Sequence, residues 1–193
     1  MADLYGMDPA RIERLRSPER LEYFDPAKIW DALDPDPSVT LIDIGSGVGF
    51  VTLPSARRYP QATAVGCDIL EGMVALLKDA ASEEGLGNVD VRHMEPGVVP
   101  LDADSADIVV MAQVHHELDA PAPLLADCAR ILRPGGTIAI VDWKDEDNGK
   151  SPAAGRRVPP NRIRAELTDA GFRDIQSHEI YTFHTFLSAT LPA

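Results

Sequence analysis

Short apolar runs and amphipathic segments alternate along most of the chain, which is the pattern of an α/β protein. The runs are rich in β-branched residues and too short for free-standing helices, so each suits a buried strand. Five strands are predicted in this way, at residues 39–44, 62–68, 89–93, 107–111 and 137–141. Helical spacing predicts helices around residues 51–59, 73–77, 124–132 and 160–170, and two final strands at residues 174–178 and 181–187.

The residues before this alternation are predicted to form a helical arm. Asp-Pro pairs at positions 8–9 and 25–26 can each start a helix, because proline is tolerated in the first turn. Three aromatic side chains of the arm either line a substrate pocket or pack the arm onto the body: Tyr23, Phe24 and Trp30. We expect one domain over residues 1–193, with an arm at 1–37 and a core at 38–193.

The stretch VTLIDIGSGVGFV, residues 39–51, is the first candidate for ligand binding. Its strand leads into glycines at positions 45, 47 and 49, and a helix follows. Glycine adopts conformations that other residues resist and lets a ligand approach the main chain. The order of strand, glycine turn and helix is typical of nucleotide-binding folds, although an ordinary tight turn is the alternative. Phe50 breaks the dinucleotide fingerprint G-x-G-x-x-G, which disfavours a nicotinamide cofactor.

Acidic side chains follow the second and third strands, at the strand ends where α/β sheets bind ligands. Asp68 follows the glycine turn at about the 20-residue spacing of an acid that binds ribose hydroxyls. Ile69 can pack against an adenine or ribose, Met94 can cover a ring face, and Glu95 can accept from an adenine amino group. The alternatives are a helix-capping role for Asp68 and a solvated loop position for Glu95.

The fourth strand leads into AQVHHEL, residues 112–118, at another carboxyl edge. Two histidines and a glutamate in succession suggest a metal site. However, adjacent histidines do not face the same way and no i, i+4 histidine pair is present, so we expect no metal. His115 or His116 can instead take a proton from a reacting nucleophile. The competing interpretation is a histidine at a helix start, bonded to backbone.

Composition narrows the choice of partner. The chain has 193 residues, 45% hydrophobic and 25% charged, and a formal net charge of −13. This charge argues against nucleic acid or an anionic membrane surface and favours a neutral or cationic small molecule. Without a signal-like segment or a bilayer-spanning apolar run, we expect a cytoplasmic protein. Cys67 and Cys128 lack metal-ligand spacing, so buried free thiols are expected.

Five features in order resemble the class I S-adenosylmethionine (SAM)-dependent methyltransferases. They are DIGSGVG from Asp43, the acid Asp68, the MEP turn at Glu95, VHHEL from Val114 and RILRPGGTIAIVDWK from Arg130. Within that class, roughly residues 38–188 are similar to the small branch of ubiquinone/menaquinone-biosynthesis methyltransferases. The resemblance implies an α/β, Rossmann-like sheet of seven mostly parallel strands, with the last strand antiparallel beside the sixth and helices on both faces.

The resemblance also implies a binding site for SAM. It places the methionyl part over the glycine turn, the ribose at Asp68, and the sulfonium near the backbone of Ala112 and Gln113. The candidate cofactor-binding residues are Asp43, Gly45, Ser46, Gly47, Gly49, Asp68, Ile69, Met94, Glu95, Ala112 and Gln113. The chain departs from the pattern of this branch at two places. Glu95 stands where aspartate is commoner, and SPAAG at 151–155 stands where G-P-P often precedes a basic pair, here Arg156 and Arg157. The second region is expected to border the acceptor pocket, so the acceptor's identity does not carry over.

We therefore expect in-line methyl transfer from SAM to an O, N, C or S atom of a small molecule, with S-adenosylhomocysteine (SAH) as product. The protein must align donor and acceptor and exclude water, and it needs His115 or His116 as a base only for a weakly acidic hydroxyl. Arsenic methylation, found among relatives, needs several exposed cysteines that this chain does not supply. A SAM-binding sensor or partner subunit without catalysis and a nicotinamide oxidoreductase stay as alternatives. The oligomeric state stays open, with a homodimer as one candidate.

Overall fold

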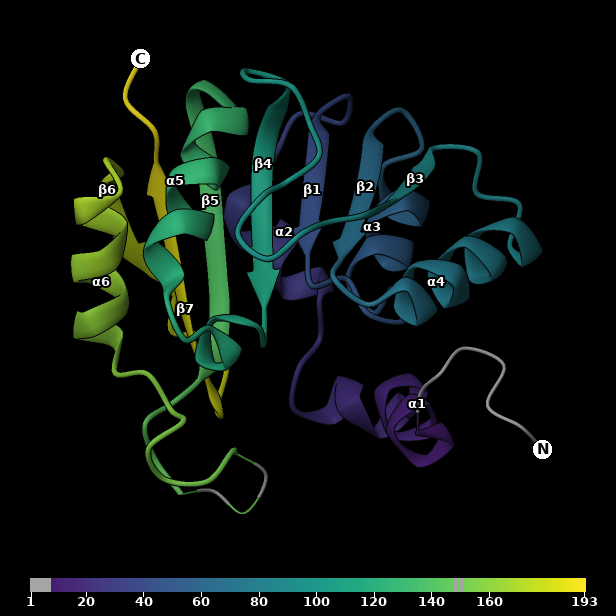
Figure 1. The fold of residues 1–193 in the computed structure, drawn as a ribbon, viewed down its shortest axis with the longest axis horizontal. Helices are drawn as coiled ribbons and strands as arrows, with labels where there is room; N and C mark the ends of the chain where they lie inside the picture. The colour runs from purple at the N-terminus through teal and green to yellow at the C-terminus, as the bar shows by residue number, and fades with distance from the viewer. Residues whose placement is uncertain (1–7, 148, 150) are drawn as a thin grey trace. The chain divides into compact units, whose positions relative to one another are not determined.

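The computed structural model describes residues 8–147, 149 and 151–193. Its strands form a seven-stranded sheet in the order β3-β2-β1-β4-β5-β7-β6 (Figure 1). Strand β2 is parallel to β1 and β3, β4 is parallel to β5, and β7 is antiparallel to both of its neighbours, β5 and β6. The Rossmann-like topology with an inserted antiparallel last strand, implied by the resemblance, is therefore confirmed. The chain divides into two compact units, one ending at Met94 and the other beginning at Glu95, and each is described by itself.

The first unit contains three parallel strands, which are β1 (Thr40–Ile44), β2 (Thr63–Asp68) and β3 (Val89–His93). Its helices are α1 (Pro9–Arg16), η1 (Pro18–Glu22), α2 (Ala27–Leu33), α3 (Thr52–Arg58) and α4 (Glu71–Glu83). Helices α3 and α4 contact β2 and β3, and one of the clusters that they bury contains Leu53, Leu77 and Val91. The predicted strands match to within about a residue or two, because uninterrupted apolar runs mark strands buried on both faces.

The arm of the first unit begins its helices at the two Asp-Pro pairs, as predicted. The Asp8 carboxylate accepts from the backbone N–H of Ala10 at 3.0 Å, and Asp25 accepts in the same way from Ala27 at 2.9 Å. Phe24 and Trp30 are 0% and 1% exposed, so packing is the correct reading for these two aromatic residues. Residues 1–7, which belong to the predicted arm, lie outside the described residues.

The second unit contains four strands, which are β4 (Ala106–Ala112), β5 (Leu132–Trp143), β6 (Arg173–Ser177) and β7 (His184–Thr190). Its helices are η2 (His115–Glu117), α5 (Pro121–Ile131) and α6 (Pro160–Asp169). Helices α5 and α6 contact each other, and α6 also contacts β6 and β7. The last strand was predicted at residues 181–187 but lies about three residues later, because it pairs with β5 from His184 to Thr190.

The RPGG segment at residues 133–136 lies between the helix predicted around residues 124–132 and the strand predicted at residues 137–141. Helix α5 does end at Ile131, but β5 begins at once with Leu132 and includes the segment. The register with β4 shifts there, and the backbone of Gly135 and Gly136 bonds to Leu191 at 2.9 and 2.8 Å. Glycine is required because a Cβ on Gly136 would lie 2.8 Å from the carbonyl oxygen of Arg133. The glycines thus form a bulge within the strand.

Candidate functional site

The glycine turn between β1 and α3 is held in the left-handed region of the backbone. Gly45, Gly47 and Gly49 have φ angles of 68°, 53° and 86°, values that other residues adopt only with strain. The N–H groups of Gly45 and Ser46 both donate to the carbonyl oxygen of Cys67 on β2, at 2.8 and 3.0 Å. The turn is thereby fixed against the neighbouring strand.

Two of these glycines serve different purposes. A Cβ placed on Gly49 would lie 2.4 Å from Leu77 Cδ1 and 2.8 Å from Leu53 Cγ, so this glycine lets two helices pack closely. A Cβ on Gly47 would meet only the carbonyl oxygen of Gly45, at 4.0 Å. The space beside Gly47 is therefore open for a ligand to approach the main chain.

Asp68 ends β2 and lies across from the glycine turn. Its Oδ2 accepts from the N–H of Gly47 at 2.9 Å, and its Oδ1 accepts from the N–H of Leu70 at 2.9 Å. Each carboxylate oxygen has a second acceptor site, so these bonds leave capacity for two ligand hydroxyls. The Asp68 carbonyl oxygen also accepts from the N–H of Met94 at 3.0 Å, which fixes this buried methionine beside the strand end.

Asp43 lies inside the first unit, where it is 2% exposed. Its Oδ2 accepts from Thr52 Oγ1 at 2.6 Å, which ties β1 to the start of α3. Burial raises the pKa of Asp43 to about 7. The buried Arg20 guanidinium partly opposes this rise, and it lies 3.9 Å from the ring centroid of Phe50.

Several features of the first unit fit the polar parts of SAM. The turn offers open backbone at Gly47, and Asp68 retains acceptor capacity for ribose hydroxyls. Ser46 Oγ is buried and has no hydrogen-bond partner among the described residues, and buried polar atoms ordinarily have one. Ile69 is 50% exposed, so its apolar side chain is available for contact with a ring.

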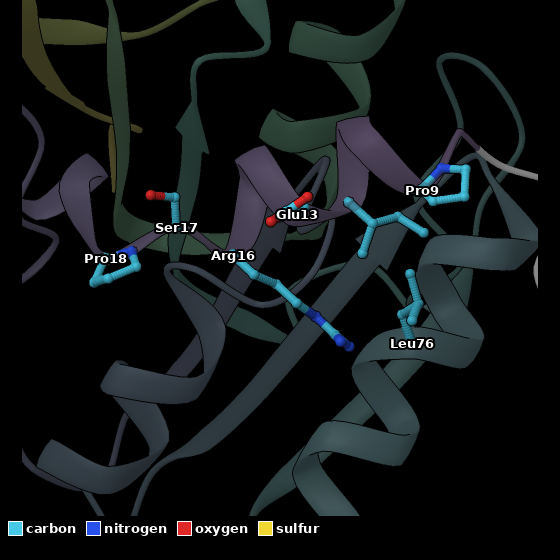
Figure 2. A pocket seen from close by; sticks show the side chains of 7 residues that line it. Pro9, Glu13, Arg16, Ser17, Pro18 and Leu76 are labelled. Carbon is cyan, nitrogen blue, oxygen red and sulfur yellow. The ribbon is translucent and has the colours of Figure 1, made fainter.

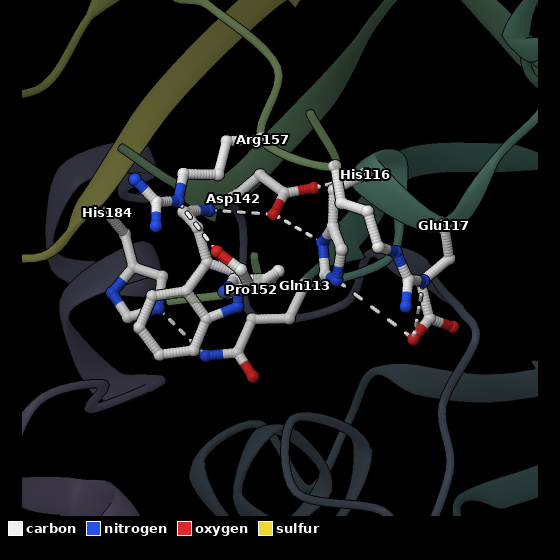
Figure 3. A network of polar contacts seen from close by, with 9 residues as sticks. Gln113, His116, Glu117, Asp142, Pro152, Arg157 and His184 are labelled. Carbon is white, nitrogen blue, oxygen red and sulfur yellow. Dashed lines mark hydrogen bonds and ion pairs between the residues drawn. The ribbon is translucent and has the colours of Figure 1, made fainter. Parts of the chain in front are cut away.

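In the second unit, Asp142 organises a network at the end of β5 (Figure 3). This carboxylate is 1% exposed and accepts three hydrogen bonds. They come from His116 Nδ1 at 2.7 Å, the His116 backbone N–H at 2.8 Å and the Trp143 backbone N–H at 2.7 Å. Because an ionised carboxylate only accepts, His116 Nδ1 donates to Asp142, and Nε2 on the other side of the ring lies 4.0 Å from Glu117 Oε1. A histidine oriented by an aspartate in this way is suited to act as a general base.

The neighbouring His115 has different partners. Its side chain is buried, and its Nε2 lies 3.0 Å from Glu166 Oε2 on α6. Arg162 donates to the other oxygen of Glu166 at 2.9 Å. Burial lowers the pKa of His115, although the nearby Glu166 opposes this effect. His115 therefore links η2 to α6, whereas His116 binds the end of β5.

Gln113 and His184 form a second part of the network. Gln113 Nε2 lies 2.8 Å from His184 Nε2, and the amide nitrogen can only donate. Gln113 has a φ of 58°, a strained conformation for this residue type that often marks functional positions. The ring of His184 lies 4.3 Å from that of Trp143. Nearby, Arg157 Nε donates to the carbonyl oxygen of Pro152 at 2.7 Å.

With this geometry known, the chain can be compared with known proteins. Residues 42–140 match the model of a family described as "Methyltransferase domain". The chain belongs to this methyltransferase family. A crystal structure of a SAM-dependent methyltransferase from Aquifex aeolicus matches 96% of this chain and 99% of that chain, with a TM-score of 0.90 and 29% identity. The resemblance to class I SAM-dependent methyltransferases is therefore confirmed, with SAM as cofactor.

Curated relatives of this methyltransferase have related names. A nocamycin O-methyltransferase of Saccharothrix syringae is 40% identical over 126 residues, which cover 62% of this chain and 44% of that protein. A ubiquinone biosynthesis O-methyltransferase of Parvibaculum lavamentivorans is 28% identical over 137 residues, 71% of this chain and 52% of that protein. An arsenite methyltransferase of Halobacterium salinarum is 27% identical over 152 residues, 72% of this chain and 39% of that protein. The chain spans about half the length of these curated relatives.

The structure brings some predicted site residues of the methyltransferase into contact and gives others separate surroundings. Gly47 and Asp68 are joined by a hydrogen bond, and His116 joins the Asp142 network. Glu95 is exposed and forms an isolated β-bridge with Val98. Ala112 ends β4 in register with Val141 of β5. The cofactor-binding and catalytic roles of the predicted residues stay predictions.

Three residues of the network were not predicted to have a role: Asp142, Arg157 and His184. Asp142 follows the fifth apolar run at a carboxyl edge, so the rule that singled out Asp68 and Glu95 could have identified it. The pairing of His184 with Gln113 depends on an antiparallel strand that returns 71 residues later. No local pattern indicates such a contact.

The first unit also contains a pocket at the start of the arm. Its volume is about 600 Å³, and it is lined by Leu76 and residues from the start of the arm, among them Pro9, Glu13 and Arg16 (Figure 2). None of the predicted cofactor-binding residues lines it. The volume of this pocket is therefore not a reason to place the SAM site in it.

Within residues 8–147, 149 and 151–193, no group of three or more His, Cys, Asp and Glu side chains is arranged to hold a metal ion. No helix there is long and apolar enough to cross a membrane. Cys67 and Cys128 form no disulfide, and both are 0% exposed, as predicted for buried thiols. Burial raises the pKa of Cys67 to about 12.

Proposed function

We propose that this methyltransferase transfers a methyl group from SAM to a hydroxyl group of a small molecule. The observation that carries this proposal is the His116–Asp142 pair, because it provides an oriented base that an already neutral amine acceptor would not need. The names of two relatives, nocamycin O-methyltransferase and ubiquinone biosynthesis O-methyltransferase, support the same acceptor chemistry. Arsenite is not supported, because both cysteines are buried.

The cofactor would be held by the residues predicted from the sequence. Asp68 would accept from the ribose hydroxyls, and the open backbone at Gly47 would accommodate the methionyl part. Ser46 Oγ would gain a hydrogen-bond partner that it lacks among the described residues. The remaining candidates are Asp43, Gly45, Gly49, Ile69, Met94, Glu95, Ala112 and Gln113.

When bound, SAM supplies a methyl group that is already activated by the positive sulfonium. His116 Nε2 would take the proton of the acceptor hydroxyl when the methyl group is transferred. Asp142 stabilises the resulting imidazolium through its bond to Nδ1. General-base catalysis of this kind contributes roughly 10²- to 10⁴-fold in rate. Of the two candidate bases, we assign this role to His116, because His115 is engaged with Glu166.

The first experiment is a calorimetric titration with SAH of the wild type and Asp68→Ala. We expect binding by the wild type and a loss of roughly ten- to a hundredfold in the variant, because charge-assisted hydrogen bonds to two hydroxyls disappear. Asp90→Ala is the matched control, since Asp90 is an acid on the neighbouring strand whose recorded ion pair is with Arg92. Equal SAH affinity of both variants would contradict the ribose assignment.

The second experiment separates an enzyme from a SAM-binding sensor. Transfer of a labelled methyl group from SAM is measured against a panel of phenols, aliphatic alcohols and matched amines. We expect transfer to hydroxyl acceptors and a strong loss of rate in His116→Gln without loss of SAH affinity. Transfer to amines that is insensitive to His116→Gln would contradict O-methylation. SAH binding without transfer to any acceptor would favour the sensor.

A further inference from the structure

Arg157 is a nearly buried cation whose ion-pair partner is an exposed carboxylate. Its side chain is 8% exposed, and Nε donates to the carbonyl oxygen of Pro152 at 2.7 Å. Within the described part of the chain, its recorded ion pair is with Asp147, 3.7 Å from Nη2, and Asp147 is 82% exposed. A guanidinium has five N–H donors, and a buried charge is costly unless it is paired and hydrogen-bonded. The Nη donors of Arg157 therefore favour an additional anionic partner.

Figure 3 draws this guanidinium together with the proposed base. Arg157 and His184 lie on one side of Asp142 in this view and His116 on the other, while the hydrogen bond of Arg157 goes to Pro152. The Asp142 carboxylate already accepts three hydrogen bonds from His116 and Trp143, so it is committed to orienting the base. None of these three hydrogen bonds to Asp142 comes from Arg157.

A second cation lies next to Arg157 in the sequence. Arg156 Nη2 is 3.9 Å from Glu117 Oε1, a distance too long for a hydrogen bond, and both side chains are more than half exposed. Two guanidinium groups thus accompany the network in a chain whose formal net charge is −13. Among the described residues, both guanidinium groups thus have only distant carboxylate partners, at 3.9 and 3.7 Å, which leaves hydrogen-bond donors for a further anion.

We propose that the methyl acceptor carries a carboxylate and that the Nη donors of Arg157 bind it while His116 receives the proton of the hydroxyl. This inference rests on the proposed function and narrows its acceptor to small hydroxy acids. The planar fork of a guanidinium matches the two oxygens of a carboxylate, which favours this group over other anions. The net charge of the chain predicted a neutral or cationic acceptor, and this inference replaces that expectation. Salt screens the distant charges of the chain, so contacts within the site decide which ligand binds.

The test measures binding of matched ligands to the SAH-saturated protein by calorimetry. The pairs are 2-, 3- and 4-hydroxybenzoate against the corresponding hydroxybenzamides, together with 4-hydroxyphenyl phosphate. We expect at least one hydroxybenzoate to bind roughly tenfold or more tightly than its amide, because a charge-assisted pair is lost in the amide. Amides that bind as tightly as the acids, or no binding of any hydroxybenzoate, would overturn the inference. Tighter binding of the phosphate than of every carboxylate would also overturn it.

Variants test whether Arg157 causes the preference for acids over amides. Arg157→Gln should reduce the ratio of acid to amide affinity to near one, and Arg157→Lys should keep part of it, because the charge remains while the fork is lost. Arg133→Gln is the charge-matched control, since Arg133 pairs with Asp107 at the opposite end of β5. A preference that persists in Arg157→Gln, or that Arg133→Gln removes equally, would overturn the assignment.

The two proposals fail in different ways. SAH affinity is measured in every variant before the second ligand is added, and we expect it to be unchanged in Arg157→Gln. Loss of SAH binding by the wild type would contradict the proposed function itself. Normal SAH binding without a preference for acids would contradict only the role of Arg157.

Discussion

The glycine turn of the first unit and the Asp142 network of the second prepare for ligands by different means. The turn uses mainly backbone, and its key side-chain contact joins Gly47 to Asp68 across 21 positions. The network uses side chains that join His116 to Asp142 across 26 positions and Gln113 to His184 across 71. Contacts made by backbone need particular residue types at fixed spacing, whereas side-chain networks depend on how distant segments meet.

The two regions also respond to pH in opposite directions. Asp43, behind the glycine turn, has a raised pKa of about 7 because it is buried. Its buried negative charge makes the folded state less stable as pH rises. His115, beside the network, has a lowered pKa for the same physical reason, and so opposes folding as pH falls. Burial of an acid and burial of a base thus give opposite slopes of stability with pH.

The largest effect should come from removing the charge of the network's central carboxylate. In Asp142→Asn, the amide cannot hold His116 in the same tautomer, and the methyl-transfer rate should fall by roughly 10²- to 10⁴-fold. The measurement is kcat for a hydroxyl acceptor identified in the panel, with SAH affinity measured alongside. Asp127→Asn serves as control, because Asp127 bonds Val99 and Arg130 outside the network. An unchanged kcat in Asp142→Asn would show that the His116 pair is structural.

The next effect concerns the two glycines of the turn. Gly49→Ala should lower the free energy of unfolding by about 3 kcal/mol, because a Cβ clashes with Leu77 in a left-handed backbone. Gly47→Ala meets no such clash, so we expect it to lower the free energy of unfolding by only about 1 kcal/mol. We expect Gly47→Ala to lose more SAH affinity than Gly49→Ala does. Urea denaturation and SAH titration of both variants provide the test. Equal stability losses would remove the distinction between a packing glycine and a ligand-facing one.

These glycines also show what the sequence could and could not predict. The apolar runs predicted the strands, and the spacing of Asp43, the three glycines and Asp68 predicted a nucleotide-binding turn. The sequence could not separate Gly47 from Gly49, because that depends on where Leu77 of another helix lies. It indicated both histidines equally, since their partners Glu166 and Asp142 lie far along the chain.

A moderate effect should follow from the pH dependence of Asp43. Its raised pKa means that the folded state binds a proton more tightly than the unfolded chain, so wild-type stability should fall as pH rises from about 4 to about 7. Each pH unit within that window corresponds to about 1.4 kcal/mol when the group titrates fully. Asp43→Asn should remove this slope in urea denaturation between about pH 4 and 7, and Asp90→Asn, at a half-exposed acid, should retain it. A wild-type slope that survives in Asp43→Asn would exclude Asp43 as its source.

The smallest effect should come from His115. Because its pKa is lowered in the folded state, stability is fully present above the ordinary value of about 6.5 and is lost as pH falls below it. His115→Gln should flatten this loss between pH 7 and 5, by about 1 kcal/mol or less, and leave kcat nearly unchanged. A large fall of kcat in His115→Gln would move the catalytic assignment from His116 to its neighbour.

The two cysteines allow the local opening of each unit to be measured separately. Cys67 belongs to β2 of the first unit and Cys128 to α5 of the second, and neither thiol is exposed. A thiol-reactive reagent can modify each one only during a local opening of its own unit. With Cys67→Ser and Cys128→Ser as single-thiol proteins, the labelling rates would report separately how often each unit opens, and whether SAH slows the opening of one unit or of both.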